Sequence, residues 1–279
     1  MSNPTLSQPL SGTGGTVYPR QWRKPAFIES RYQRWGWILA VTLYLVLALA
    51  SLEINWARLS DGLARGWLFV GAFLQPNFSD RQGDIMQGFK ESLTMTVGAT
   101  ALGVLLSIPV AIGAARNLAP LWIYLLCRGF IAMSRTLNEI IVAIFFVAMF
   151  GFGPFAGFLT LTFATIGFMA KLMAENMEEI EASQLEALRA TGASYGQLLD
   201  FAVLSQVLPR LIGLSLYRLD INFRESAVIG IVGAGGIGAT LNTAMDRYEF
   251  DTAAAIILVI IAIVMVAEYA SGWLRKRIQ

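Results

Sequence analysis

Long uncharged apolar segments are the feature that most restricts the folds open to this chain. Residues 35–52 (WGWILAVTLYLVLALASL) carry no charge, and residues 253–267 are all apolar. A helix needs roughly 20 apolar residues to cross the hydrocarbon core of a bilayer. Only 14% of the residues are charged, against about 25% in a typical soluble domain. Because so much apolar surface cannot be hidden from water, the sequence predicts an all-α integral membrane protein.

Six membrane-spanning helices are predicted, and basic residues orient them. The predicted spans cover residues 35–52, 92–115, 121–152, 155–173, 209–230 and 252–273. Basic residues precede the first span and follow the last, so the positive-inside rule places both termini in the cytoplasm. Residues 1–34 then form a basic, disordered cytoplasmic tail, and residues 53–91 form a polar connector on the outer side of the membrane.

The third apolar stretch is too long for one straight span. The segment RTLNE at residues 135–139 interrupts it, which predicts one long helix that is broken or tilted, with two short helices as the alternative. Asn138 is expected to stabilise the break. Arg135 and Glu139 are four residues apart, so they are expected to neutralise each other on the helix.

Residue types that carry much of enzyme chemistry are scarce here. The chain contains one cysteine, Cys127, and no histidine. This composition excludes Cys/His metal sites, a disulfide within the chain and a Ser-His-Asp triad. The net charge of +2 is too small to suggest nucleic acid. We therefore expect no catalytic residue, no metal site and no nucleic-acid partner.

A glycine-rich segment, AVIGIVGAGGIGATL at residues 227–241, matches the dinucleotide-binding pattern G-x-G-x-x-G. A nicotinamide-dependent enzyme would need a soluble helix after this loop, but only about a dozen residues separate it from the last predicted span. We therefore expect the glycines to permit sharp turns and close helix contacts instead. These glycines are Gly233, Gly235, Gly236 and Gly238.

A polar hairpin between the fourth and fifth spans carries most of the information about function. Strong helix formers fill residues 178–190, and Gly192 suits a left-handed C-cap. Ser194 and Gln197 suit a capping box, and Pro209 suits the start of the next helix. Two interpretations are open: a hairpin on the membrane surface, or a protruding helix that docks in a groove of a cytoplasmic partner.

The hairpin resembles the EAA loop of ATP-binding-cassette importer permeases, the loop that couples them to their ATPase. The resemblance rests on Glu186-Ala187, on Gly192 and on Leu208-Pro209. Leu188 replaces the usual second alanine, and Ser205 stands where the family usually has a proline. The resemblance implies that the following residues contact the ATPase: Glu186, Ala187, Leu188, Gly192, Ala193, Leu208 and Pro209.

A second segment, YRLDINFRESAVIGIVGAGGIG at residues 217–238, is similar to the fifth span of phosphonate-import permeases. The six-span layout and the basic N-terminus agree, and the resemblance covers residues 92–279. It implies a type I importer permease core, like that of methionine importers, with one extra N-terminal span and a periplasmic connector. The substrate it implies is a phosphonate, with phosphite, hypophosphite or phosphate as alternatives, and a secondary transporter that works without ATP as a more distant one.

The same resemblance implies the partners. They are a second copy of this chain, a cytoplasmic ATPase dimer that uses ATP and Mg, and a periplasmic phosphonate-type binding protein, at the bacterial inner membrane. The sequence contains no G-x-x-x-x-G-K-[ST] motif, so ATP hydrolysis is expected in a separate polypeptide. This chain is expected to hold no cofactor of its own.

Four charges in the middle of the fifth predicted span need partners or water. Each charge at a bilayer centre costs about 2.5–3.5 kcal/mol on insertion scales. Asp220 and Arg224, four residues apart, suit a structural ion pair. Arg218, Asn222 and Glu225 share another face, which either packs on a neighbouring span or lines a substrate pathway.

An arginine in the pathway suits an anion, because guanidinium matches phosphonate oxygens in a bidentate way. The candidate pathway residues from the two segments are Arg218, Asn222, Glu225, Ser134, Arg135 and Asn138.

Overall fold

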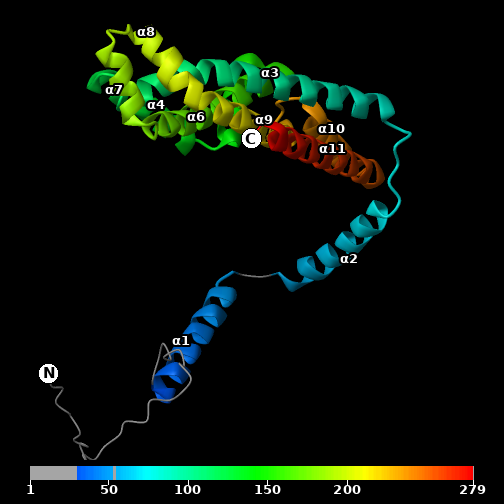
Figure 1. The fold of residues 1–279 in the computed structure, drawn as a ribbon. Helices are drawn as coiled ribbons and strands as arrows, with labels where there is room; N and C mark the ends of the chain where they lie inside the picture. Colours follow the sequence, from blue (N-terminus) through cyan, green and yellow to red (C-terminus); the bar gives the residue numbers. More distant parts are fainter. Residues whose placement is uncertain (1–29, 53–54, 279) are drawn as a thin grey trace, which may run out of the picture. The chain divides into compact units, whose positions relative to one another are not determined.

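The computed structural model describes residues 30–52 and 55–278, where it consists of helices joined by short turns, with no strand (Figure 1). Most of the predicted tail, residues 1–29, lies outside the described residues. The chain divides into two compact units, residues 1–63 and 64–279. Helix α1 (Arg31–Ala50) belongs to the first unit, and α2 (Trp56–Phe73) begins there and ends in the second.

Membrane-spanning helices of the predicted kind are present. Five helical segments are long and apolar enough to cross a bilayer, and a bent pair of shorter helices makes a sixth. The five are α1, α3 (Gln82–Ala114), α6 (Pro154–Glu178), the helical segment Tyr195–Asp246, and α11 (Phe250–Ile278). The predicted fold class, an all-α membrane protein with six spans, is confirmed.

The predicted connector at residues 53–91 is largely helical. Helix α2 occupies its first half, and α3 begins at Gln82, ten residues before the predicted start of the second span. The end of α2 is attached to the start of α11, because the rings of Phe69 and Phe250 meet edge to face with centroids 5.0 Å apart. Asn77 also donates its backbone N–H to the Asp251 carbonyl at 3.2 Å.

The third predicted span is two short helices, which confirms the alternative to one long helix. Helices α4 (Leu121–Thr136) and α5 (Glu139–Phe150) are bent by 94° at the break between them. Asn138 caps α5, because its side-chain oxygen accepts the Ile140 N–H at 2.9 Å. The break removes the one-turn spacing of Arg135 and Glu139, so these two described side chains form no ion pair, contrary to expectation.

The hairpin between the fourth and fifth predicted spans begins and ends differently from the prediction. Helix α6 runs to Glu178, and a separate helix, α7 (Ala182–Ala190), follows after a short turn, so residues 178–190 are not one helix. Gly192 has the left-handed conformation expected of it, with φ of 75°. Ser194 and Gln197 form the predicted capping box at the start of α8 (Tyr195–Leu198). Figure 1 shows α7 and α8 together at one end of the helical bundle.

Pro209 does not start a helix, contrary to prediction. A π-helical segment, η1 (Leu199–Leu204), joins α8 to α9 (Ser205–Ile231), and Pro209 lies inside α9. A proline within a helix removes one backbone hydrogen bond and disturbs the preceding turn. The turn that precedes α9 is the π-helical one, so the irregularity is accommodated without ending the helix.

The bundle is built around α3, which packs against α6 and α9, while α4 and α5 flank α6. A short helix that the sequence did not predict, α10 (Gly236–Asp246), packs on α3, α9 and α11. Glu91 and Ser92 of α3 hold its first turn: the Glu91 carboxylate accepts the Gly236 N–H at 3.1 Å, and Ser92 Oγ accepts the Ile237 N–H at 2.9 Å.

Glycines make the turn between α9 and α10 possible. Gly233, Gly235 and Gly236 have φ of 93°, 74° and 75°, a region that other residues rarely adopt. A Cβ at Gly235 would lie 2.5 Å from the Pro154 nitrogen, and a Cβ at Gly238 would overlap the Ala227 carbonyl. The glycine motif is therefore a helix-packing device in which backbone meets backbone.

We predict that Gly238→Ala destabilises the protein by about 1–3 kcal/mol, because the backbone of α9 cannot yield to the added methyl group. The melting temperature of the purified protein in detergent measures this effect. Gly129→Ala in α4 is the matched control, since nothing lies within 4 Å of a Cβ there. A Gly238→Ala variant that melts with the control would contradict the close contact.

Candidate functional site

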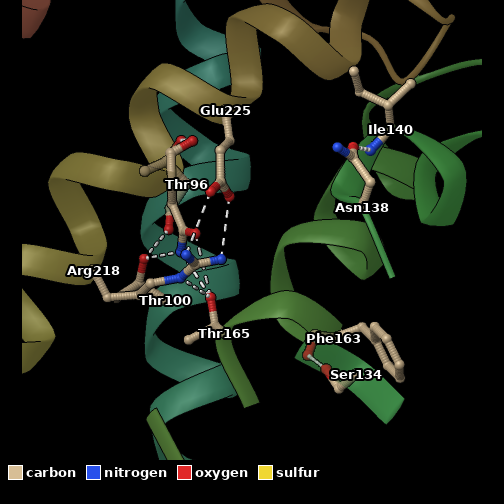
Figure 2. A network of polar contacts seen from close by, with 10 residues as sticks. Thr96, Thr100, Ser134, Asn138, Ile140, Phe163, Thr165, Arg218 and Glu225 are labelled. Carbon is tan, nitrogen blue, oxygen red and sulfur yellow. Dashed lines mark hydrogen bonds and ion pairs between the residues drawn. The ribbon is translucent and has the colours of Figure 1, made fainter. Parts of the chain in front are cut away.

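A buried polar network lies in the middle of the bundle, centred on α9. The Arg218 side chain is 3% exposed, and its Nη2 lies 3.1 Å from Oε2 of Glu225, two turns further along the same helix. Figure 2 shows the guanidinium between Glu225 on one side and Thr165 on the other. Arg218 Nε donates to Thr165 Oγ1 at 3.1 Å. The charge of Arg218 is therefore paired inside the protein rather than presented to lipid.

Asn222 joins three helices within this network. Its amide nitrogen donates to Thr100 Oγ1 of α3 at 2.8 Å and to Thr165 Oγ1 of α6 at 2.9 Å. The residue is completely buried. Two interpretations were open for Asn222, packing on a neighbouring span and lining a substrate pathway. These contacts correspond to packing. They tie α9 to both α3 and α6 with directional bonds.

A cavity of about 310 Å³ lies beside the network, at the break between α4 and α5. Ser134, Arg135, Asn138 and Glu139 line it from the break, and Phe168 and Arg218 line it from α6 and α9. The structure therefore brings Arg218 together with all three candidate pathway residues of the third predicted span. Asn222 and Glu225 do not line this cavity, although Glu225 touches Arg218, which does.

Two arginines share one aromatic ring at this cavity. The guanidinium carbons of Arg135 and Arg218 lie 5.6 Å and 5.1 Å from the centroid of the Phe168 ring. Such contacts hold a cation while leaving some of its N–H donors available. Glu139 lines the same cavity, so its wall carries charges of both signs. This arrangement suits passage of an anion better than its permanent retention.

The sequence did not identify the partners of these residues. Thr100, Thr165 and Phe168 lie in apolar helices, and nothing in their local pattern marks them. Thr100 also donates its hydroxyl to the Thr96 carbonyl one turn back, as threonines in many helices do. The only available signal was that a buried asparagine and arginine require polar partners from neighbouring helices.

Asp220 and Arg224 form an ion pair on α9. The carboxylate is buried, with 6% of its side chain exposed, whereas the Arg224 side chain is 51% exposed. The pair therefore lies at the surface of this chain, with its acid facing inward.

The hairpin that resembles a coupling loop is packed against the bundle on one side and exposed on the other. Leu185 of α7 is buried in the hydrophobic core, while Glu186 and Ala187 are exposed. Gln206 of α9 donates to Gln184 of α7 at 2.8 Å. Gly192, Leu208 and Pro209 are also exposed, and Leu188 and Ala193 are half-buried. Helix α7 thus presents a free face at the end of the bundle.

We predict that Glu225→Leu destabilises the protein by about 3–5 kcal/mol, because it leaves the Arg218 guanidinium buried without its counter-charge. The double variant Arg218→Met/Glu225→Leu should regain much of that loss, since it removes the uncompensated charge. Melting temperatures in detergent compare the two. A double variant no more stable than Glu225→Leu would contradict the pairing.

Two solved structures with the same fold come from ABC transporters. The structure superposes on a chain of the MetNI methionine ABC transporter, described in inward-facing conformations, with a TM-score of 0.62 and 21% identity. This match covers 72% of the present chain and 99% of the other. A chain of an amino acid ABC transporter matches with a TM-score of 0.59 and 15% identity, over 70% of the present chain and 94% of the other.

Relatives identified by sequence share a higher identity with this chain than these solved structures do. The phosphate-import permease protein PhnE of Mycolicibacterium smegmatis is 40% identical over 257 residues, which are 90% of this chain and 47% of that protein. The present chain thus spans about half the length of this relative. The phosphite transport system permease protein PtxC of Stutzerimonas stutzeri is 37% identical over 242 residues, 86% of each chain.

A family model covers more than half of the chain. Residues 103–279, which contain the α4–α5 break, the hairpin, the buried network except Thr100, and the glycine turn, match the model of the binding-protein-dependent transport system inner membrane component. The chain therefore belongs to the family of inner membrane components of binding-protein-dependent transport systems.

Proposed function

We propose that this chain is the transmembrane subunit of an ATP-driven importer that moves phosphonates or a related phosphorus oxyanion by alternating access. The observation that carries the substrate class is the cavity where Arg135 and Arg218 lie over one aromatic ring. Guanidinium groups match tetrahedral oxyanions through paired N–H donors. The names of the M. smegmatis and S. stutzeri relatives, which refer to phosphate and phosphite, support the same class.

The geometry of the cavity fits a conduit rather than a tight site. Importers that receive substrate from an external binding protein need only a weakly attractive, water-filled path. Glu139 and Glu225 lie close to the two arginines and compete with the substrate for them. An anion is therefore attracted to the path without being trapped there. Arg218, Ser134, Arg135 and Asn138 line the cavity and remain our candidates for direct contact with the substrate. Glu225 and Asn222, the other two candidates, act on the path through Arg218, which Glu225 pairs with and Asn222 supports through Thr165.

The proposed assembly follows from the family and from the exposed hairpin. It contains two copies of this chain, a cytoplasmic ATPase dimer that uses ATP and Mg, and a periplasmic substrate-binding protein. Both termini lie in the cytoplasm of a bacterial cell, residues 53–91 lie in the periplasm, and this chain is not itself catalytic. The free face of α7 around Glu186 and Ala187 suits a groove of the ATPase, since an exposed helix face is what such grooves bind.

Reconstitution tests the substrate class. The permease would be purified with its ATPase and binding protein, placed in lipid vesicles, and assayed for ATP hydrolysis and uptake with methylphosphonate, phosphite, hypophosphite, phosphate and methionine. We expect a phosphorus oxyanion to stimulate both activities and methionine to stimulate neither. A complete absence of stimulation by the phosphorus oxyanions would refute the substrate class, and uptake without ATP would refute the importer mechanism.

A charge reversal on the hairpin tests the proposed coupling. Glu186→Arg should weaken co-purification of the ATPase and lower uptake at least about tenfold, equivalent to about 1.4 kcal/mol, because it places a cation where the docked helix presents a carboxylate. Asp61→Arg on α2, also an exposed acid, is the control and should have little effect. Wild-type association of the Glu186→Arg variant with the ATPase would exclude this face as the docking surface.

A further inference from the structure

Arg224 is the more exposed of the two arginines in the middle of α9, with 51% of its side chain exposed against 3% for Arg218, and its pairing with Asp220 does not explain it. Both residues lie on the same helix, so their ion pair ties α9 to no other helix. One oxygen of the buried Asp220 carboxylate, Oδ1, has no hydrogen-bond partner in the described part of the chain. An ion pair one turn apart adds little to the stability of a helix. The stabilisation of the helix by this ion pair is therefore too small to account for the burial of the carboxylate.

The direction along α9 in which Asp220 holds the Arg224 side chain is more informative. Arg224 lies seven residues before the end of α9 at Ile231, about 10 Å along the helix. An arginine facing lipid would extend its guanidinium towards that nearer end. Asp220 lies one turn in the opposite direction and holds the guanidinium towards the middle of the span. The guanidinium is half-exposed on this chain, and a cation held in a spanning segment is stabilised by water or polar protein beside it rather than by hydrocarbon.

The exposed face that carries Arg224 leads to the cavity. Tyr217, Arg224 and Val228 are spaced seven and four residues apart, so they lie on one side of α9, and all three are exposed. The Tyr217 ring lies 6.2 Å from the ring of Phe168, which lines the cavity. Arg224 is also about 9 Å further along the helix than Arg218. The face therefore begins beside Phe168 at the edge of the cavity and runs towards the far end of α9, although Arg224 itself does not line the cavity.

Only one nitrogen of Arg224 is engaged. Nη2 bonds to Asp220 Oδ2, and the other N–H donors make no hydrogen bond within the described residues. We propose that Asp220 positions Arg224 in the aqueous translocation path, where its remaining donors contact the anionic substrate before or after Arg218 does. This proposal deepens the proposed function and rests on it. Asp220 is a positioning residue, and Arg224 is a substrate-contacting one.

Water access to this face can be measured without any substrate. The chain has one cysteine, so Val228→Cys in a Cys127→Ser background gives a single thiol beside Arg224 while leaving the ion pair intact. We expect a charged methanethiosulfonate reagent to label it in the assembled complex in vesicles. Val266→Cys on α11, also a valine and more exposed than Val228, is the control for a face in lipid and should stay unlabelled. An unlabelled Val228→Cys, or one that forms a disulfide with the second copy, would overturn the proposal.

Transport assays separate a substrate contact from a structural pair. Arg224→Gln should lower uptake of methylphosphonate or phosphite about tenfold, the rate equivalent of one charge-assisted hydrogen bond, and Arg224→Lys should retain most of it. The exchange Asp220→Arg/Arg224→Asp keeps the pair but places an acid in the path, so its uptake should be low. The same exchange at Lys171 and Glu175, an exposed pair with the same spacing on α6, should leave uptake intact.

The outcomes distinguish this proposal from the one it rests on. Wild-type uptake by the exchanged Asp220→Arg/Arg224→Asp variant would show a structural pair and overturn the role of Arg224. If wild-type protein transports no phosphorus oxyanion, the proposed substrate class fails instead. Labelling of Val228→Cys then still reports whether Arg224 faces water.

Discussion

The cost of placing charge and amide groups inside an apolar bundle determines how these helices must pack. Arg218 and Asn222 on α9 are buried, and unpaired polar groups in that environment cost several kcal/mol each. Their partners come from other helices, so α3 and α6 must approach α9 closely. Gly103 lets α3 and α6 approach each other closely beside α9, because a Cβ there would lie 2.6 Å from the Thr165 side chain. Gly167 has the same role for α4, where a Cβ would lie 2.7 Å from Ser134 Cβ. Small residues thus place the threonines that satisfy Asn222 and the serine that borders the cavity.

The break between α4 and α5 gives the cavity its polar wall. A straight span would carry Arg135 and Glu139 on one face, where they would neutralise each other. The 94° bend separates them, and Asn138 satisfies the exposed N–H of the second helix. Arg135 instead reaches the Phe168 ring that Arg218 also contacts. Because Asn138 caps the second helix at the break, Arg135 and Glu139 do not pair with each other, and both side chains line the cavity.

Local patterns in the sequence were sufficient for features whose causes are local. Apolar runs predicted the spans, Gly192 and Ser194 predicted the turn and the capping box, and the spacing of Asp220 and Arg224 predicted their ion pair. Features that depend on neighbouring helices were missed. Glu225 lies two turns from Arg218, beyond the one-turn spacing at which helical pairs are recognised. Helix α9 continues through Pro209 because the π-helical segment before it accommodates the irregular hydrogen bonding that the proline causes. Helix α10 was missed because its glycines suggested only a turn, and its first N–H groups are satisfied by Glu91 and Ser92, about 145 residues earlier in the chain.

A single helical segment connects the exposed hairpin to the buried charges. From Tyr195 the chain remains helical through η1 and α9 to Ile231, passing Leu208, Pro209 and then Arg218 about 15 Å further along. A helix transmits displacement along its axis, since its hydrogen bonds resist compression, and the π-helical turn is the place where that ladder is least regular. In the proposed assembly, movement of α7 by the ATPase therefore acts on α9. Helix α9 carries Arg218 and Arg224, the two arginines that we place in the path. Because Asn222 bonds α9 to Thr100 and Thr165, α9 cannot rotate or slide without breaking or exchanging those bonds. The proposed alternating access would therefore require these bonds to be exchanged between distinct arrangements of the helices.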